Sequence, residues 1–142
     1  MLNPKFVDIQ QAIAIHDFLI EKYGGSLGLR DEGLLESALA QPQASFFGEL
    51  LHPTIAEQAA VYLFHLCKNH PFIDGNKRAA FGVMVAFVAV NNYRLNLSND
   101  QLYNLVLDVA ASKIDKPQLI EVIRQNLIST PPVVHGDSGG FS

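Results

Sequence analysis

The sequence predicts an all-α domain of about six helices, packed around one helix that is buried on all sides. Polar residues that cap helix starts, several of them matched by a polar side chain three positions later, recur along the chain. An apolar run over residues 79–90 is too short to span a membrane and indicates the central helix. No segment shows the alternating apolar pattern that is typical of a strand.

The first two predicted helices are bounded by caps at one end and by breakers at the other. Asp8 can cap a helix that runs to about Tyr23, where a pair of glycines ends it. His16 lies in the middle of this helix, either as a hydrogen-bonded core residue or as a support for a functional site. Asp31 caps a shorter helix that ends before Pro42.

The other four predicted helices follow in order. Thr54 begins a capping box and a helix to about residue 68. The central helix is expected over 76–91, where Gly82 allows close contact with a neighbouring helix. Ser98 begins a second capping box and a helix to about residue 112. Asp115 opens the last helix, to about residue 127, with a proline in its first turn.

Length and composition predict the number of domains and exclude several classes of protein. The length predicts a single domain over 1–130, with a flexible glycine-rich tail over 131–142. The net charge of −4 argues against direct binding to nucleic acid, which favours a basic surface. A single cysteine excludes an internal disulfide, and the N-terminus shows no apolar leader segment. We therefore expect a cytoplasmic protein without a membrane span.

The segment 70–78, HPFIDGNKR, concentrates polar chemistry directly before the central helix. The first turn of a helix leaves N–H groups without partners and carries a partial positive charge, so it favours anions. Gly75 allows the backbone to approach a ligand, and Asn76 can cap the helix and donate from its amide. Lys77 and Arg78 add cationic donors suited to phosphate. The pattern predicts a phosphate site.

Two further residues of this segment indicate the reaction. Asp74 would repel a bare polyphosphate, so a carboxylate beside two cations indicates Mg²⁺ bound together with phosphate oxygens. His70 is a natural general base for a hydroxyl nucleophile. Together they predict transfer of a nucleotide phosphate to an alcohol. The alternative is a surface ion pair between Asp74 and Lys77 or Arg78, a simple helix cap, and an ordinary loop histidine.

This segment closely resembles the signature of the Fic superfamily, His-x-Phe-x-Asp/Glu-Gly-Asn-Gly/Lys-Arg, at every defined position. The likeness is strongest to the death-on-curing (Doc) branch, toxins of bacterial type II toxin-antitoxin pairs. It extends to residues 15–17 and 28–39, and roughly 7–128 fit that branch. The resemblance implies the all-α Fic fold.

The resemblance also implies a role for each residue of the motif. His70 would deprotonate the hydroxyl of a target protein, Phe72 would anchor the loop in the core, and Asp74 would bind Mg²⁺. The residues that would hold the phosphates of ATP are Gly75, Asn76, Lys77 and Arg78.

Lys77 separates two activities within the superfamily. Fic enzymes that transfer AMP commonly carry glycine at this position, whereas the Doc branch shares the lysine and is associated with a reversed nucleotide pose. The resemblance therefore implies phosphorylation of a Ser or Thr hydroxyl, with elongation factor Tu as the expected target. The alternatives are an AMP transferase and a non-catalytic binding module that acts as the co-repressor of an antitoxin.

Two further expectations concern partners. In Fic proteins a flap near residues 25–30 docks the target, so Arg30 and Asp31 are predicted to help there, with a small β-hairpin at the flap. As an alternative, they form a solvated turn and a helix cap. The chain lacks the inhibitory pattern Ser/Thr-x-x-x-Glu-Gly/Asn. Inhibition is therefore expected from an antitoxin that binds in trans.

Overall fold

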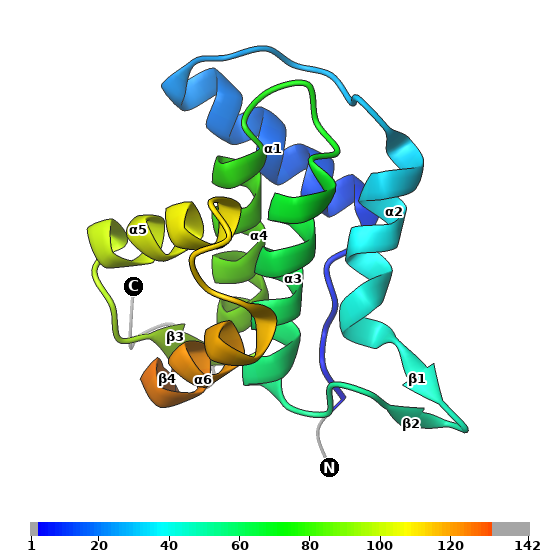
Figure 1. Cartoon of the computed structure of the whole chain (residues 1–142), viewed down its shortest axis with the longest axis vertical. Helices are drawn as coiled ribbons and strands as arrows, with labels where there is room; N and C mark the ends of the chain where they lie inside the picture. The colour runs from blue at the N-terminus through cyan, green and yellow to red at the C-terminus, as the bar shows by residue number, and fades with distance from the viewer. Residues whose placement is uncertain (1–2, 132–142) are drawn as a thin grey trace, which may run out of the picture.

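The computed structural model describes residues 3–131 of the chain, and the predicted tail beyond residue 131 lies outside them. This part contains six α-helices, one 3₁₀ helix and two small antiparallel sheets, which confirms the predicted all-α class (Figure 1). The helices are α1 (Ile9–Tyr23), α2 (Glu32–Ala40), η1 (Gln41–Gln43), α3 (Ile55–Asn69), α4 (Asn76–Val90), α5 (Asn99–Ala110) and α6 (Lys116–Asn126). The strands are β1 (Ser45–Phe46), β2 (Glu49–Leu50), β3 (Tyr93–Leu95) and β4 (Leu127–Ser129).

The predicted caps determine where five of the helices begin. Each cap side chain accepts a hydrogen bond from a backbone N–H of the first turn, and a cap of this kind stabilises a helix by about 1 kcal/mol. The caps of α1, α3, α5 and α6 are complete capping boxes, because the residue three positions on also bonds back to the cap. The five capping residues are Asp8, Asp31, Thr54, Ser98 and Asp115.

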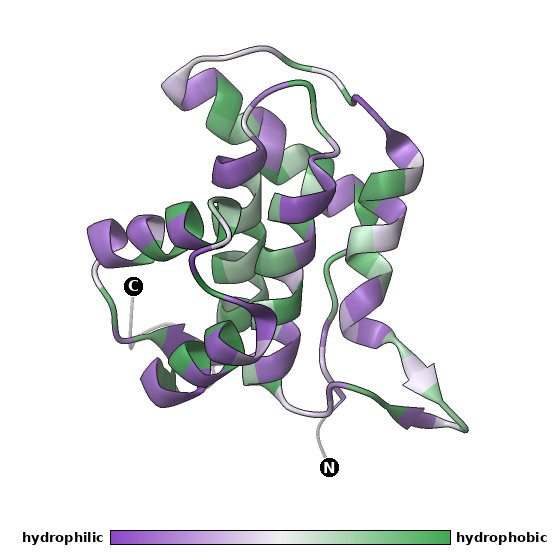
Figure 2. Cartoon of the chain, in the orientation of Figure 1, coloured by the Kyte–Doolittle hydropathy of each residue, from purple (hydrophilic) through white to green (hydrophobic). Residues whose placement is uncertain are grey.

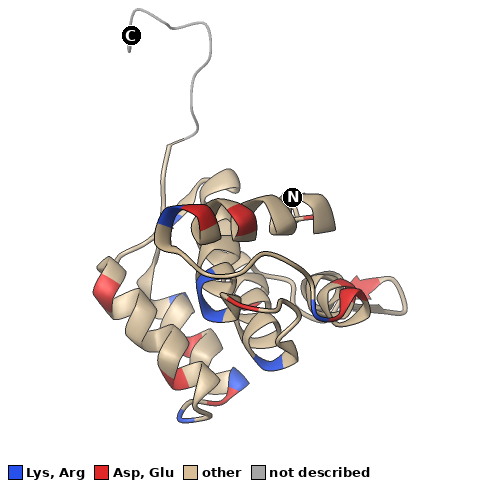
Figure 3. Ribbon diagram, turned by 90° about the horizontal axis from the view of Figure 1, so that it is seen from above, with Lys and Arg blue, Asp and Glu red and all other residues tan. Residues whose placement is uncertain are grey.

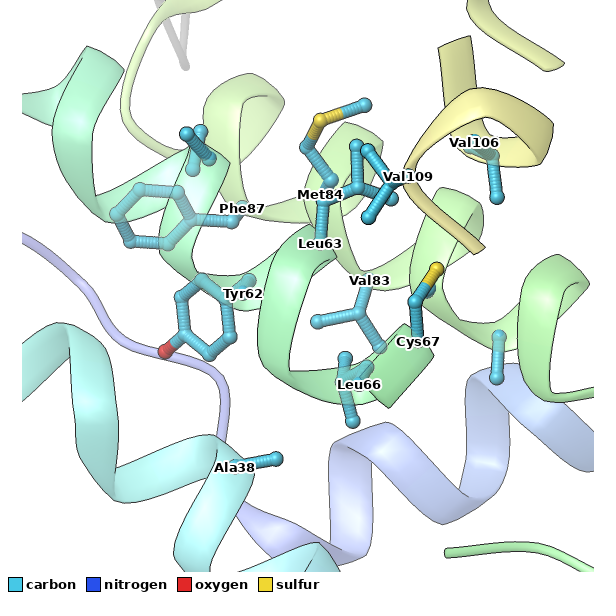
Figure 4. Packing of buried hydrophobic residues seen from close by; sticks show 14 of the residues in the cluster. Ala38, Tyr62, Leu63, Leu66, Cys67, Val83, Met84, Phe87, Val106 and Val109 are labelled. Atoms are coloured by element: carbon cyan, nitrogen blue, oxygen red, sulfur yellow. The ribbon is translucent and has the colours of Figure 1, made fainter. Parts of the chain in front are cut away.

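Two antiparallel helices, α3 and α4, form the centre of the molecule (Figure 1). Tyr62 and Leu66 of α3 lie near Val83 and Phe87 of α4 in one apolar cluster (Figure 4). Both helices are hydrophobic in their middle turns and hydrophilic at the end joined by the 70–75 loop (Figure 2). The prediction of α4 alone as a helix buried on all sides was too simple, because Val90 of α4 is 43% exposed and α3 shares the core.

The helix α1 packs closely against α4 at the glycine that the sequence indicates. A Cβ atom placed on Gly82 would lie 2.8 Å from Ile15 Cγ2 and 2.8 Å from Leu19 Cδ1. Since real Cβ atoms do not approach other atoms so closely, only glycine fits here without a shift of these side chains or of α1. This contact fixes the position of α1, which also carries His16 to the loop between α3 and α4.

The prediction that strands are absent outside the flap was wrong. The strands β3 and β4 pair and join the ends of α4 and α6, and β1 pairs with β2 in a hairpin. The hairpin follows η1 in the chain, and it lies at the opposite end of the molecule from residues 25–30, where it was expected (Figure 1). Its two-residue turn, Phe47 and Gly48, has positive φ at both positions, the geometry of tight hairpin turns. Strands of two or three residues are too short to show alternation.

No helix in residues 3–131 is both long and apolar enough to cross a bilayer. The apolar run that indicates the central helix is instead covered by protein, with α3 on one side and α1 on another.

Histidine 65 on α3 makes the stability of the fold dependent on pH. Its Nε2 atom is buried without a hydrogen-bond partner in the described part of the chain. Burial lowers the pKa of His65 to about 4, and the nearby Lys116 and His52 add to the effect. Protonation of this ring is therefore more favourable in the unfolded chain, where the ordinary pKa is 6.5.

We predict that His65→Gln flattens the acid side of the stability profile. Between pH 6.5 and about 4 the unfolded state binds the proton that the folded state rejects, so wild-type stability falls through this window and levels off below it. Urea unfolding of both proteins at pH 7, 5.5 and 4 measures the difference. A variant that loses as much unfolding free energy as the wild type over this window would contradict the assignment.

Candidate active site

The loop between α3 and α4 reverses the chain at one end of the two central helices. His70 ends α3 in a left-handed conformation with φ 53° and ψ 54°, and Gly75 precedes α4 with φ 77°. A left-handed conformation costs a non-glycine residue on the order of 1 kcal/mol, and such positions are common at functional sites. The surrounding contacts must therefore hold His70 in place.

Phe72 and Asn76 bind each other across the interior of this loop. The backbone N–H of Phe72 donates to Asn76 Oδ1 at 2.8 Å, and Asn76 Nδ2 donates to the Phe72 carbonyl at 2.9 Å. Both residues are buried, and the ring of Phe72 lies in the core cluster. The prediction that Asn76 caps the helix was wrong, because Gly75 is the cap and both ends of the Asn76 amide are in use. Because the side chain closes the loop, the backbone N–H of Asn76 is the group placed at the start of α4 for an anion.

The segment 26–30 covers the loop with backbone hydrogen bonds (Figure 1). The N–H of Ile73 donates to the Gly28 carbonyl at 3.0 Å, and the N–H of Arg30 donates to the Pro71 carbonyl at 2.7 Å. Leu29 and Phe72 form an isolated antiparallel bridge. The loop therefore does not depend on a ligand for its shape.

The side chains of Arg30 and Asp31 have partners within the molecule. Arg30 Nε donates to the His70 carbonyl at 2.7 Å, and its Nη2 donates to the Asn69 carbonyl at 2.9 Å. These carbonyls belong to the last turn of α3, where a cation is favoured. Asp31 caps α2 by accepting from the Leu34 N–H. Arg30 thus supports the left-handed turn at His70, and a role for either residue in target docking stays a prediction.

One pocket of about 170 Å³ brings together the predicted catalytic, metal and phosphate residues. Neither Arg30, Asp31 nor Phe72 is among the residues that line it. The lining residues are His70, Ile73, Asp74, Gly75, Asn76, Lys77, Arg78 and Tyr103. Tyr103 was not predicted, because it comes from α5 and nothing in its own segment distinguishes it from a helix surface residue.

Asp74 presents an ionised carboxylate to this pocket. The N–H groups of Ser26 and Gly75 donate to its Oδ2 and Oδ1 at 3.0 and 2.9 Å. These two hydrogen bonds lower the pKa of Asp74, and the positive charge of Arg78 lowers it further.

The donor set fits Mg²⁺. Residues 3–131 contain no group of three or more acidic, histidine or cysteine side chains that could enclose a metal. A single exposed carboxylate beside two cationic side chains suits Mg²⁺ bound together with a phosphate, because this ion takes most of its ligands from phosphates and water. Asp74 would hold the ion in this arrangement.

The two cations of the pocket differ in their freedom. The side chain of Lys77 is exposed and makes no hydrogen bond or ion pair with any residue in the described range 3–131. Arg78 Nη1 donates to the Gly24 carbonyl at 2.8 Å, which ties its guanidinium to the end of α1. Figure 3 looks onto this end of the molecule and shows basic helix segments next to an acidic stretch of loop. The site is thus locally cationic although the chain is acidic.

Two larger pockets adjoin the first. One, of about 510 Å³, shares Arg78 and Tyr103 with it and is also lined by Tyr23 and Phe81. The other, of about 520 Å³, shares Lys77 and is formed mostly by the C-terminal half of α5. A molecule with a phosphate chain and a flat aromatic ring would find phosphate donors in the first pocket and aromatic side chains in the 510 Å³ pocket.

The chain is similar in sequence to known proteins. The model of the Fic/DOC family matches residues 6–88. The chain is 37% identical over 95 residues to Toxin Doc of Mycolicibacterium smegmatis, an alignment that covers 66% of this chain and 73% of the relative. It is 27% identical over 121 residues to Protein kinase doc of Escherichia phage P1, covering 85% of this chain and 94% of the relative.

We predict that Gly25→Ala weakens the binding of Mg²⁺ and ATP. A Cβ atom at Gly25 would lie 2.7 Å from Asp74 Oδ2 and 3.3 Å from Arg78 Nη2, so the carboxylate and the guanidinium must move away from residue 25. We expect an increase of about tenfold in the Kd, comparable to the loss of one hydrogen bond to a charged group. Titration calorimetry with Mg²⁺ and a non-hydrolysable ATP analogue measures it.

Gly24→Ala is the matched control. Gly24 also has positive φ, at 92°, but a Cβ atom there meets nothing within 4 Å. Both variants therefore carry backbone strain, and only Gly25→Ala adds the clash. Equal losses of affinity in the two variants would show that the steric argument is incorrect.

Proposed function

Because the chain belongs to the Fic/DOC family, we propose that it is a Doc-like toxin that transfers the terminal phosphate of ATP to a Ser or Thr hydroxyl of a target protein. Elongation factor Tu is the proposed target, and arrest of translation is the proposed consequence. The observation that carries the proposal is the single pocket that holds His70, Asp74, Lys77 and Arg78 together. The name of the phage P1 relative, Protein kinase doc, supports the same reaction.

The proposed step is an in-line phosphoryl transfer. The target oxygen attacks the γ-phosphorus while the imidazole of His70 accepts the hydroxyl proton. A new P–O bond forms as the bond between the β–γ bridging oxygen and the γ-phosphorus breaks, and ADP leaves. Lys77, Arg78 and the free N–H groups at the start of α4 stabilise the negative charge of the phosphates. Mg²⁺ held by Asp74 would neutralise further phosphate charge.

Lys77 favours phosphate transfer over AMP transfer. Its charged side chain borders both the 170 Å³ pocket and the neighbouring 520 Å³ pocket. In the AMP-transferring Fic enzymes a glycine at this position leaves room for the β and γ phosphates. The lysine fills that room, so we propose the reversed pose, with the γ-phosphate beside His70. In this pose the nucleoside would occupy the aromatic pocket formed by Tyr23, Phe81 and Tyr103.

An antitoxin that binds in trans is the proposed inhibitor. The name of the mycobacterial relative, Toxin Doc, supports a toxin-antitoxin pair. A mostly apolar groove of about 460 Å³ between α1, α4 and the N-terminal segment could receive an apolar segment of the antitoxin. Its lining residues are Lys5, Phe6, Val7, Gln11, Ala14, Ile15, Ala86 and Val90.

We predict that the protein labels a target when ATP carries the isotope in its γ-phosphate, and not when the α-phosphate carries it. The purified protein, a bacterial lysate and Mg²⁺ are incubated with each ATP separately, and the labelled protein is identified by mass spectrometry. Label from the α-phosphate alone would establish the AMP transferase. Labelling from neither, with intact antitoxin binding, would favour the co-repressor.

The control for this experiment is His70→Ala. Removing a general base lowers the rate by about 10² to 10⁴, and the same variant should relieve the growth arrest that we expect on expression of the wild type. His70 is exposed, so its loss should leave folding largely unchanged. Equal labelling by this variant would exclude the assigned base.

A further inference from the structure

His16 of α1 is a buried titratable residue to which the proposed reaction assigns no role. Its exposed fraction is 1%, and its ring stacks on Phe72 with the ring centroids 3.8 Å apart and the planes 4° apart. Its Nε2 atom lies 2.7 Å from the backbone carbonyl oxygen of Asp74, and its Nδ1 lies 2.9 Å from Asp17 Oδ1. We propose that His16 is a positioning residue, which holds the Asp74–Gly75 peptide so that the Asp74 carboxylate faces the phosphate pocket.

The hydrogen bond to Asp74 has a defined direction. A backbone carbonyl can only accept, so the Nε2–H of His16 is the donor. On the other side of the ring, the Asp17 carboxylate faces Nδ1 and fixes the orientation of the imidazole. Both nitrogens are thereby engaged within the protein. His16 is therefore not a second general base, and its effect on the reaction must pass through Asp74.

The Asp74 carbonyl has no partner in the helix that follows. The first backbone bond of α4 runs from the Ala79 N–H to the Gly75 carbonyl, one residue later in the chain. If an apolar residue replaced His16, the Asp74 carbonyl would face a side chain that cannot donate a hydrogen bond. A buried acceptor without a donor costs folding free energy. The peptide would be expected to rotate toward solvent and to take the carboxylate with it.

The left-handed turn at Gly75 fits against the same side chain. A Cβ atom on Gly75 would lie 3.5 Å from His16 Nε2 and 2.8 Å from Ile20 Cδ1. The helix α1 therefore approaches the turn closely enough to contact its backbone. His16 supplies the hydrogen bond and the adjacent turn of α1 supplies the steric limit, so the Asp74 peptide has little freedom.

A pair of substitutions separates this role from simple packing. His16→Phe keeps an aromatic ring that can stack on Phe72 but lacks a donor. His16→Gln loses the stacking but can place an amide N–H near the position of Nε2. If His16 is only a core residue, Phe should preserve both stability and activity better than Gln. If it positions Asp74, Gln should preserve activity better than Phe although it packs less well.

The first test is enzymatic, and it rests on the proposed function. We expect His16→Phe to lower kcat by about 10- to 100-fold, the scale of a catalytic group displaced by about 1 Å, and His16→Gln to stay within about fivefold of the wild type. Thermal melting is measured in parallel. The matched control is His65→Gln, a half-buried histidine on α3 near Lys116 and His52, which should keep wild-type kcat. A Phe variant as active as the Gln variant would overturn the proposal.

The second test does not depend on any activity. Ser26 and Gly75 donate their N–H groups to the Asp74 carboxylate, so their amide hydrogen exchange reports its position. His16→Phe should speed exchange at both amides by about tenfold, as expected for the loss of a hydrogen bond, while His16→Gln should not. Unchanged exchange in the Phe variant would overturn the positioning role. If the wild type transfers no label but these amides respond as expected, the proposed function fails and the positioning role stands.

Discussion

The site depends on a backbone constraint: most of the hydrogen bonds that hold the loop between α3 and α4 come from residues that do not line the pocket. Asn76 closes the loop from inside, Arg30 holds its first carbonyls, and His16 holds the carbonyl of Asp74. The backbone of residues 26–30 forms hydrogen bonds with the outer side of the loop. Because these contacts fix the loop, the side chains at its surface are free to contact a ligand. The core of α3 and α4 fixes the two ends that the loop must join.

The cationic side chains at this end of the molecule are also of two kinds: those bonded within the protein and one without such a bond in the described residues. The guanidinium of Arg78 donates to a carbonyl at the end of α1, and that of Arg30 donates to carbonyls at the end of α3. Lys77 has no such contact with the described residues and lies where two pockets meet. A lysine without such contacts is a mobile point charge, whereas an arginine held by other groups is a fixed donor. Under the proposed function, Arg78 would hold the phosphate chain in one place and Lys77 would adjust its position to the phosphates.

Much of the fold was predictable from the sequence, because helix caps and apolar periodicity are local signals. The caps at Asp8 and Asp115, for example, correspond to α1 and α6. The motif residues were predictable for the same reason, since they occupy one short segment. The role of Asn76 was not predictable, because an asparagine amide can either cap a helix or form hydrogen bonds across a loop. The contributions of Ser26 and Tyr103 come from distant segments, and only the three-dimensional structure brings them to the pocket.

The most direct test of the proposal that this loop is preformed to bind phosphate is a crystal structure of the protein with Mg²⁺ and a non-hydrolysable ATP analogue. The structure should show the γ-phosphate beside His70, the ion on the Asp74 carboxylate, and the backbone of residues 70–78 in the conformation described above. A complex with the α-phosphate at His70, or a loop that rearranges to admit the nucleotide, would contradict the central claim.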